Sequence, residues 1–296
     1  MNKILRLVLV VIALFSASNA ISQVATLFEY PVAPDTCSSI ESRCNYSVQH
    51  FWDNCELTKP FAAQNDSLLL EAMLTYFDIM KAGANTNVSL SSVRDLMFKS
   101  QANHDNFLKL ASMAEYVLYY HDTDVIDDLY LTFAQSVADA SWAKKEVRNH
   151  YAEQIKRLNT SKLGQPLLDF EYTSITGARK HLSDNRSATA KVYVIMFSDV
   201  DSGSSIERMR LSADITFGQA VDQGVIKMIN IVVGDVPKQW DADSKSYSEK
   251  WEVGASKEIG GKLDLRIMPC IYVLDEEFRV LAKNKTVDFM KSMLSM

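Results

Sequence analysis

The chain has 296 residues, of which 47% are hydrophobic and 23% charged, so it is long enough for two globular domains with sizeable cores. Its formal net charge is −6, from 37 acidic and 31 basic residues, and it contains no long basic run. This charge balance gives no electrostatic support for a nucleic-acid partner.

The first 20 residues have the order of a signal peptide. Lys3 and Arg6 form a short basic region, Leu7 to Phe15 is apolar, and Ser18–Ala20 supplies the small residues of a cleavage site. The apolar run is shorter than the roughly 20 residues that span a bilayer, and no later segment is long and apolar enough. We therefore expect a signal peptide over residues 1–20, cleavage near Ala20, and a soluble periplasmic or secreted protein.

Apolar residues recur about every 3.6 positions between Ser38 and Leu158, which is the period of amphipathic helices. The pattern predicts a first helix from about Ser38 and five more over residues 67–83, 89–100, 104–120, 122–138 and 142–158. Six helices in about 120 residues predict a compact all-α domain over residues 21–160.

Three of the four cysteines, Cys37, Cys44 and Cys55, lie close together near the start of this domain. The first predicted helix begins with a capping box at Ser38–Glu41 and places Cys44 and Cys55 on its apolar face. We favour buried apolar thiols at these positions. A disulfide from Cys37 to either of the other two is the alternative in an oxidising compartment.

We expect no metal and no cofactor. No histidine stands at zinc-ligand spacing from the cysteines. The aspartates at 122, 124, 127 and 128 lack the ligand spacing and central glycine of a calcium loop. Acidic residues at a helix start are explained by the helix dipole.

Beyond Asn159 the pattern changes to alternating strands and helices. It predicts strands near 170–174, 190–199 and 225–235, a helix over 204–221, and a helical and loop region over 237–265. Two strands then flank a turn at 275–277, and a short helix over 286–296 follows. The strands over 190–199 and 225–235 are apolar throughout, which indicates burial on both faces.

This order resembles the thioredoxin fold in its membrane-tethered reductase and peroxiredoxin-like branch. "GQPLLDF" at 164–170, Met268-Pro269 before a strand, and "YVLDEEFRVLAKN" at 272–284 carry the resemblance. It covers Lys162 to Met296 and implies an α/β thioredoxin-like domain over residues 161–296. In that family the proline before this strand is cis.

The first half, with "FEYPVAPDT" and "SVQHFWDNCEL", is similar to an uncharacterised helical domain of exported proteins in anaerobic Gram-negative bacteria. In those proteins the helical domain precedes a thioredoxin-like one. The resemblance implies an envelope location and no particular activity.

The loop after the 190–199 strand holds a paired cysteine motif in the family. In this sequence the two cysteine positions are Ser202 and Ser205. A serine hydroxyl cannot form a mixed disulfide, so thiol–disulfide exchange at this loop is lost. A nucleophilic serine needs a base, and His181 is the only histidine in this half. We expect the loop serines to cap the helix, with Ser204 and Glu207 forming a capping box.

Two functions remain open. The first is a redox-inactive binding or scaffolding module whose partner is an envelope protein or an extended peptide. The second is a thiol-disulfide oxidoreductase or peroxidase-type enzyme that uses Cys270 or the N-terminal cysteines. We favour the first, because alternation places Cys270 in the core. The candidate groove consists of Asp201, Ser202, Gly203, Ser204, Ser205, Met268, Pro269 and Cys270.

Overall fold

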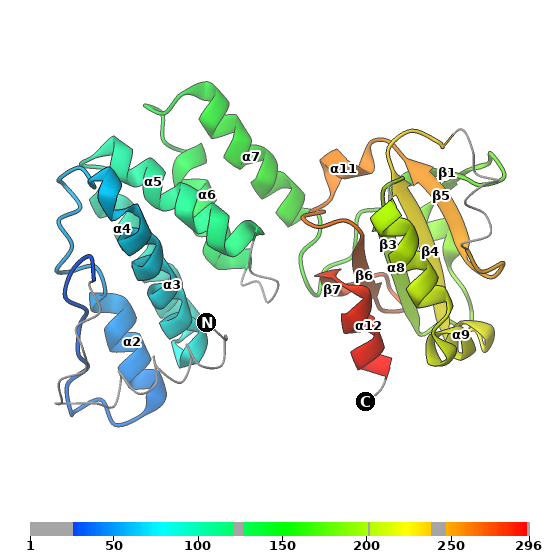
Figure 1. Ribbon diagram of the computed structural model, residues 1–296, viewed down its shortest axis with the longest axis horizontal. Coiled ribbons are helices and arrows are strands. Elements are labelled where there is room, and N and C mark those ends of the chain that lie inside the picture. The colour runs from blue at the N-terminus through cyan, green and yellow to red at the C-terminus, as the bar shows by residue number, and fades with distance from the viewer. Residues whose placement is uncertain (1–25, 121–126, 201, 238–246, 295–296) are drawn as a thin grey trace. The chain divides into compact units, whose positions relative to one another are not determined.

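The computed structural model describes residues 26–120, 127–200, 202–237 and 247–294, which fold as two compact units (Figure 1). The first unit extends to Ala152 and is helical, and the second begins at Glu153 and contains a β-sheet. The predicted signal peptide lies outside the described residues. Within the described ranges, no helix is long and apolar enough to cross a membrane.

The helical unit contains a counterpart of each of the six helices that the sequence predicts. They are α2 (Ile40–His50), α3 (Asp66–Gly83), α4 (Thr86–Ser100), α5 (His104–Ala114), α6 (Asp127–Ala138) and α7 (Lys145–Asn159). A 3₁₀ turn, η1 (Ala63–Asn65), precedes α3, and a π-helical stretch, η2 (Glu115–Tyr120), continues α5. The division between the two units falls within α7.

The start and end of α2 differ from the prediction. Ser39 is the N-cap, and its hydroxyl exchanges hydrogen bonds with Ser42, whose backbone N lies 3.0 Å from Ser39 Oγ. The capping box is therefore one residue later than expected and does not use Glu41. The helix ends at His50, so Cys55 lies beyond it. Phe51 follows the helix and is fully buried among aromatic rings.

The second unit contains one seven-stranded sheet in the order β2-β1-β5-β4-β3-β6-β7. The strands are β1 (Glu171–Ser174), β2 (Arg179–His181), β3 (Val192–Ser198), β4 (Ile226–Val233), β5 (Glu252–Ser256), β6 (Cys270–Leu274) and β7 (Val280–Lys285). Strands β3, β4 and β5 pair in parallel, and the remaining pairs are antiparallel.

Strand β3 is buried on both faces, as its apolar sequence predicts. Tyr193, Ile195 and Phe197 pack into one core cluster, and Val194 and Met196 pack into the other. The second cluster contains residues of α8 (Ser202–Ser212), α9 (Ile215–Asp222) and α12 (Val287–Leu294), so these helices cover that face (Figure 1). The short α11 (Ile259–Lys262) contributes Ile259 to the first cluster.

The predicted helix over 204–221 is wrong as a single element, because the structure has two helices there. The first ends at Ser212, and the Asp214 side chain then accepts the Phe217 N–H at 3.0 Å and caps the second. An aspartate that bonds to a nearby backbone amide competes with continued helix and starts a new one.

The predicted helical and loop region over 237–265 is also incorrect in part, because it contains β5. In this strand Gly254 faces Tyr172 of β1, and a Cβ atom at Gly254 would lie 2.3 Å from the Tyr172 ring. Glycine therefore allows the close approach of these two strands. Strand β2 was not predicted either. Residues 238–246 of the predicted region lie outside the described residues.

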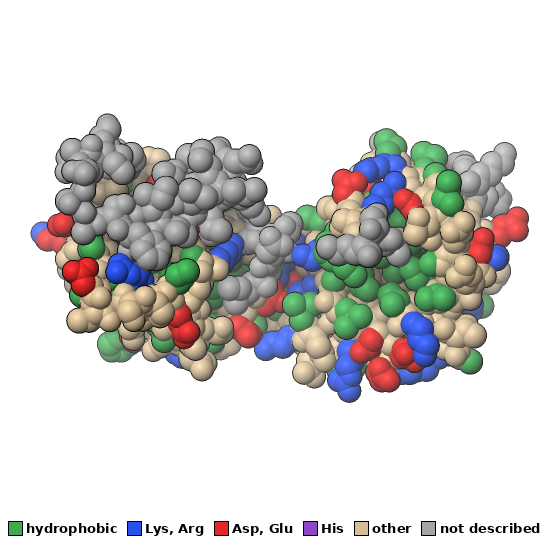
Figure 2. Space-filling model, turned by 90° about the horizontal axis from the view of Figure 1, so that it is seen from below, with side chains coloured by type: hydrophobic (Ala, Val, Ile, Leu, Met, Phe, Trp, Pro, Cys, Tyr) green, Lys and Arg blue, Asp and Glu red, His purple; other side chains and the backbone are tan. Residues whose placement is uncertain are grey.

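Figure 2 shows one outer face of the molecule, on which hydrophobic side chains of the sheet unit gather among charged ones. Several large apolar side chains of this unit are exposed, among them Ile206, Met209, Ile215 and Met293.

Candidate functional site

The candidate loop lies where β3 ends and α8 begins. Phe197 pairs with Cys270 in the antiparallel register of β3 and β6. The chain therefore leaves β3 toward the loop at the same end of the sheet where the Met268–Pro269 segment enters β6. The Met268–Pro269 peptide bond is cis. The fold thus brings together two parts of the predicted groove that lie about 65 residues apart in sequence.

The hydroxyl of Ser204 bonds within the loop. Ser204 Oγ donates to Asp199 Oδ1 at 2.6 Å, accepts the Asp199 N–H at 3.2 Å, and is fully buried. The capping box that we expected from Ser204 and Glu207 is wrong, because α8 already starts at Ser202. Glu207 instead accepts from Arg210 at 2.7 Å. Asp201 lies outside the described residues.

Arg208 binds the other loop serine, and sequence reasoning missed it. Its Nη2 donates to Ser205 Oγ at 2.6 Å, and its Nη1 donates to the Asp199 carbonyl at 3.4 Å. The Arg208 guanidinium carbon lies 5.0 Å from the centre of the Tyr247 ring, and the residue is only 1% exposed. The available signal was the i, i+3 spacing of Ser205 and Arg208 on one helix face.

Exposed apolar side chains occur in this loop, in the helix that follows it and in the segment before β6. Val200 is 68% exposed, and Met268 projects beside the cis bond. Ile206 and Met209 lie three residues apart on α8, so both occupy the exposed side of that helix. The hydroxyls of the buried Ser204 and the half-buried Ser205 are hydrogen-bonded within the protein, whereas these apolar groups face solvent.

Cys270 does not face the loop. It belongs to the core cluster that contains Phe197, on the opposite side of the sheet from the cluster that α8 joins. The thiol is fully buried, and burial, reinforced by the nearby Asp264 charge, raises its pKa far above its usual value. A buried, protonated thiol is a poor nucleophile.

His181 cannot serve as a base for the loop serines. It lies at the end of β2, the edge strand, and β1, β5 and β4 separate β2 from β3. Its nearest charged partner is Glu171 of β1, at 4.0 Å.

The cysteines of the helical unit are unpaired in the structure, as is Cys270. Cys44 is fully buried, and burial raises the pKa of its thiol. Burial, together with the adjacent Glu56 charge, raises the pKa of the half-buried Cys55 to about 12. Neither thiol has the lowered pKa of a reactive cysteine.

No group of three metal-ligating side chains occurs among the residues that the structure describes. Asp127 and Asp128 occupy the first turn of α6, while Asp122 and Asp124 lie outside the described residues.

Both halves of the chain are similar to known proteins. Residues 14–161 match the family described as Domain of unknown function (DUF5106). A thioredoxin-like protein from Bacteroides caccae superposes with a TM-score of 0.79 at 17% identity, over 92% of this chain and 99% of that one. Among curated proteins, none matches the chain.

Two further solved structures match the chain over a smaller share. A conserved protein of unknown function from Bacteroides fragilis has 22% identity and a TM-score of 0.41, over 45% of this chain and 99% of its own. The thioredoxin domain of a thiol-disulfide oxidoreductase from Bacteroides vulgatus has 16% identity and a TM-score of 0.37, over 45% and 98%. The first structure, from B. caccae, establishes the fold: a helical domain followed by an α/β thioredoxin-like domain.

Proposed function

The chain belongs to the DUF5106 family, and from this premise we propose that its thioredoxin-like unit is a redox-inactive binding module of the cell envelope. In this proposal, Ser202 and Ser205 occupy the positions that hold cysteines in redox-active members of the fold. Disulfide exchange proceeds through a sulfur nucleophile, so a loop with hydroxyls at both positions cannot perform it.

The observation that carries the proposal is a contrast between loop hydroxyls that are hydrogen-bonded within the protein and the exposed apolar side chains of Val200, Ile206, Met209 and Met268. Ser204 and Ser205 bond to Asp199 and Arg208. Neither hydroxyl has a histidine beside it, because His181 is on the far edge of the sheet. Exposed apolar side chains next to a groove are typical of a surface that binds a partner.

The ligand that fits this surface is an extended peptide with apolar side chains. Val200, Ile206, Met209 and Met268 offer apolar contacts for alternate side chains of such a peptide. The Met268–Pro269 segment, which leads into β6, forms this end of the groove. Backbone pairing with apolar side-chain contacts is a recurring mode of peptide recognition.

The alternative of a thiol enzyme depends on Cys270 or on the N-terminal cysteines. Cys270 is fully buried on the other face of the sheet, and the thiols of Cys44 and Cys55 have raised pKa values. We expect the unmodified protein not to reduce insulin disulfides with dithiothreitol as electron donor. Insulin reduction that Cys270→Ser abolishes would contradict the proposal.

Binding is tested with the reduced and alkylated B chain of insulin, an extended apolar peptide without free thiols. We expect Ile206→Ser combined with Met209→Ser to weaken its binding at least tenfold in a fluorescence anisotropy titration. Ile215→Ser is the matched control, since Ile215 is 76% exposed on α9, a different helix. Equal binding by both variants would argue against the groove.

The envelope location rests on the charged, apolar and small-residue order of residues 1–20. N-terminal sequencing of the protein recovered from the producing cell should begin at Ile21. Recovery of intact Met1 in the envelope fraction would contradict export with cleavage.

A further inference from the structure

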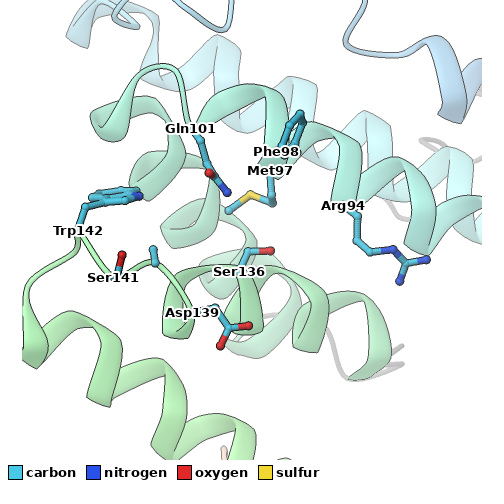
Figure 3. Close-up of a pocket in the computed structure, with 9 residues that line it drawn as sticks. Arg94, Met97, Phe98, Gln101, Ser136, Asp139, Ser141 and Trp142 are labelled. Carbon is cyan, nitrogen blue, oxygen red and sulfur yellow. The ribbon is translucent and has the colours of Figure 1, made fainter.

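The helical unit contains a pocket of about 330 Å³ that is separate from the thioredoxin-like groove (Figure 3). One wall comes from α4 and its C-cap, which contribute Arg94, Met97, Phe98 and Gln101 at the i, i+3, i+4, i+7 spacing of one helix face. The other wall comes from the end of α6 and the residues after it, from Ser136 to Trp142. This volume is in the range of small-molecule sites.

Trp142 forms a rigid apolar end of the pocket. Its indole stacks on His104 with ring centres 3.6 Å apart and nearly parallel planes, and it makes an edge contact with Phe107. These contacts hold the ring in place before any ligand arrives, which reduces the entropy cost of binding. Phe98, which also lines the pocket, is 76% exposed.

One cationic side chain, Arg94, and one anionic side chain, Asp139, line the pocket. Arg94 is exposed, and its guanidinium has no hydrogen-bond or ion-pair partner within the described part of the chain. Both carboxylate oxygens of Asp139 accept from Gln135 Nε2 at 3.0 Å, which orients the carboxylate and leaves it further lone pairs. Figure 3 shows Arg94 at one end, Trp142 at the other, and Asp139 between them.

We propose that this pocket binds an amino acid in its zwitterionic form, with an apolar or aromatic side chain. The ligand carboxylate pairs with the Arg94 guanidinium, which suits bidentate contact with a carboxylate. The ligand ammonium group pairs with Asp139, and the side chain lies against Trp142 and Met97. A polyanion such as a nucleotide is disfavoured, because Asp139 would repel it.

The probe for this site is L-phenylalanine, titrated into the full-length chain by isothermal calorimetry. N-acetyl-L-phenylalanine removes the ammonium charge, and L-phenylalanine amide removes the carboxylate. We expect saturable binding of L-phenylalanine and at least tenfold weaker binding of each blocked compound, since each loses one charge-assisted contact.

Variants of the two charged residues show which side chain each charged group of the ligand contacts. Arg94→Gln should weaken binding of L-phenylalanine at least tenfold and bring its affinity close to that of the amide. Asp139→Asn should do the same with respect to the acetylated compound. Lys145→Gln is the control, because Lys145 is exposed at the start of α7 and does not line the pocket. Circular dichroism verifies that each variant is folded.

Three outcomes would overturn the proposal: no saturable binding of L-phenylalanine, L-leucine or L-tryptophan, equal affinity for the blocked compounds, or an Arg94→Gln variant that binds like the Lys145→Gln control. Each of these outcomes is independent of the groove in the thioredoxin-like unit.

Discussion

The buried charges of the thioredoxin-like unit and the charges that line the helical pocket differ in what satisfies them. Asp264 is fully buried and accepts from Arg266 at 2.8 Å, from Lys283 at 3.0 Å and from Asn284 at 3.1 Å. In the pocket, Arg94 is exposed and has no partner among the described residues.

This difference separates structural charges from charges that are available to a ligand. Removing a partner from an enclosed network leaves a buried charge uncompensated and costs stability. Removing an exposed charge that bonds to nothing costs almost no stability, and its effect appears in binding. The loop serines resemble the first class, since Ser205 is bound to the buried Arg208.

The largest expected effect tests whether the serine loop retains the geometry of a cysteine pair. Ser202→Cys together with Ser205→Cys should form a disulfide on oxidation and give a variant that reduces insulin. The N-terminus of α8 should hold the pKa of the thiol at position 202 below the roughly 8.5 of an unperturbed cysteine.

Thiol titration with and without oxidant measures both results, and the single Ser202→Cys variant is the control. If the two thiols remain titratable after oxidation, these positions are not the cysteine positions of the fold.

Substitution of Asp264 should have the next largest effect. Asp264→Ala leaves Arg266 and Lys283 without a carboxylate that both contact, and their side chains are only 4% and 5% exposed. We expect a loss of about 3–5 kcal/mol in the free energy of unfolding, measured by urea denaturation.

Asp235→Ala is the matched control, because Asp235 is 78% exposed in its pair with Lys257. If both variants lose a similar amount of free energy of unfolding, the buried network around Asp264 stabilises the fold no more than a surface ion pair does.

The same carboxylate predicts how stability depends on pH. Burial alone raises the pKa of Asp264, but the hydrogen bonds and charges of Arg266 and Lys283 outweigh it and lower the pKa. The native state therefore binds this proton less readily than the unfolded chain does. The stabilisation is present above the unfolded value of about 3.9 and is lost as the pH falls through the lowered native pKa. Between pH 6 and pH 2, the free energy of unfolding of Asp264→Ala should fall less steeply than that of the unmodified protein. Urea denaturation at each pH measures both.

A smaller effect is expected at the loop. Ser205→Ala removes the acceptor of Arg208 Nη2 and should cost about 1.5–3 kcal/mol, because the lost bond involves a buried charged donor. Ser212→Ala, at the exposed end of the same helix, is the control and should change the free energy of unfolding by less than about 0.5 kcal/mol. Equal values for both would show that the Arg208 contact is not a stabilising one.

The smallest effect is expected in the pocket. Arg94→Gln should change the free energy of unfolding by less than about 0.5 kcal/mol, since no bond within the described residues is lost. Urea denaturation measures this value. A loss above about 1 kcal/mol would mean that Arg94 has a structural role and would contradict its assignment as a charge available to a ligand.

Helix periodicity allowed the helical unit to be predicted from sequence, because each amphipathic helix encodes its own buried face. The errors of this prediction lie at helix ends; for example, the N-cap of α2 is Ser39 and not Ser38. In the sheet unit, apolar strands such as β3 and β4 were predicted, but β5 was not. The apolar side chains of β5 are only Val253 and Ala255, on either side of Gly254, and this run is too short to indicate a strand. The strand forms because it pairs with β4 and accommodates Tyr172.

In the candidate site, too, some features could be predicted from the sequence and others could not. The absence of sulfur at Ser202 and Ser205 and the position of Pro269 before a strand are visible in the sequence. The bond between Arg208 and Ser205 is local, yet its burial depends on Tyr247, which lies about 40 residues later. No periodicity of α8 distinguishes Arg208 from a solvent-exposed arginine, so this contact was missed.

The helical first half, the α/β second half and the absence of cysteine from the loop could be read from the residues alone, because period and residue type are local properties. Three findings required the folded structure: Cys270 faces away from α8, His181 lies several strands from the serines, and Arg94, Asp139 and Trp142 line one pocket. Each of these depends on strand order or helix packing, which follow from contacts between residues far apart in the chain.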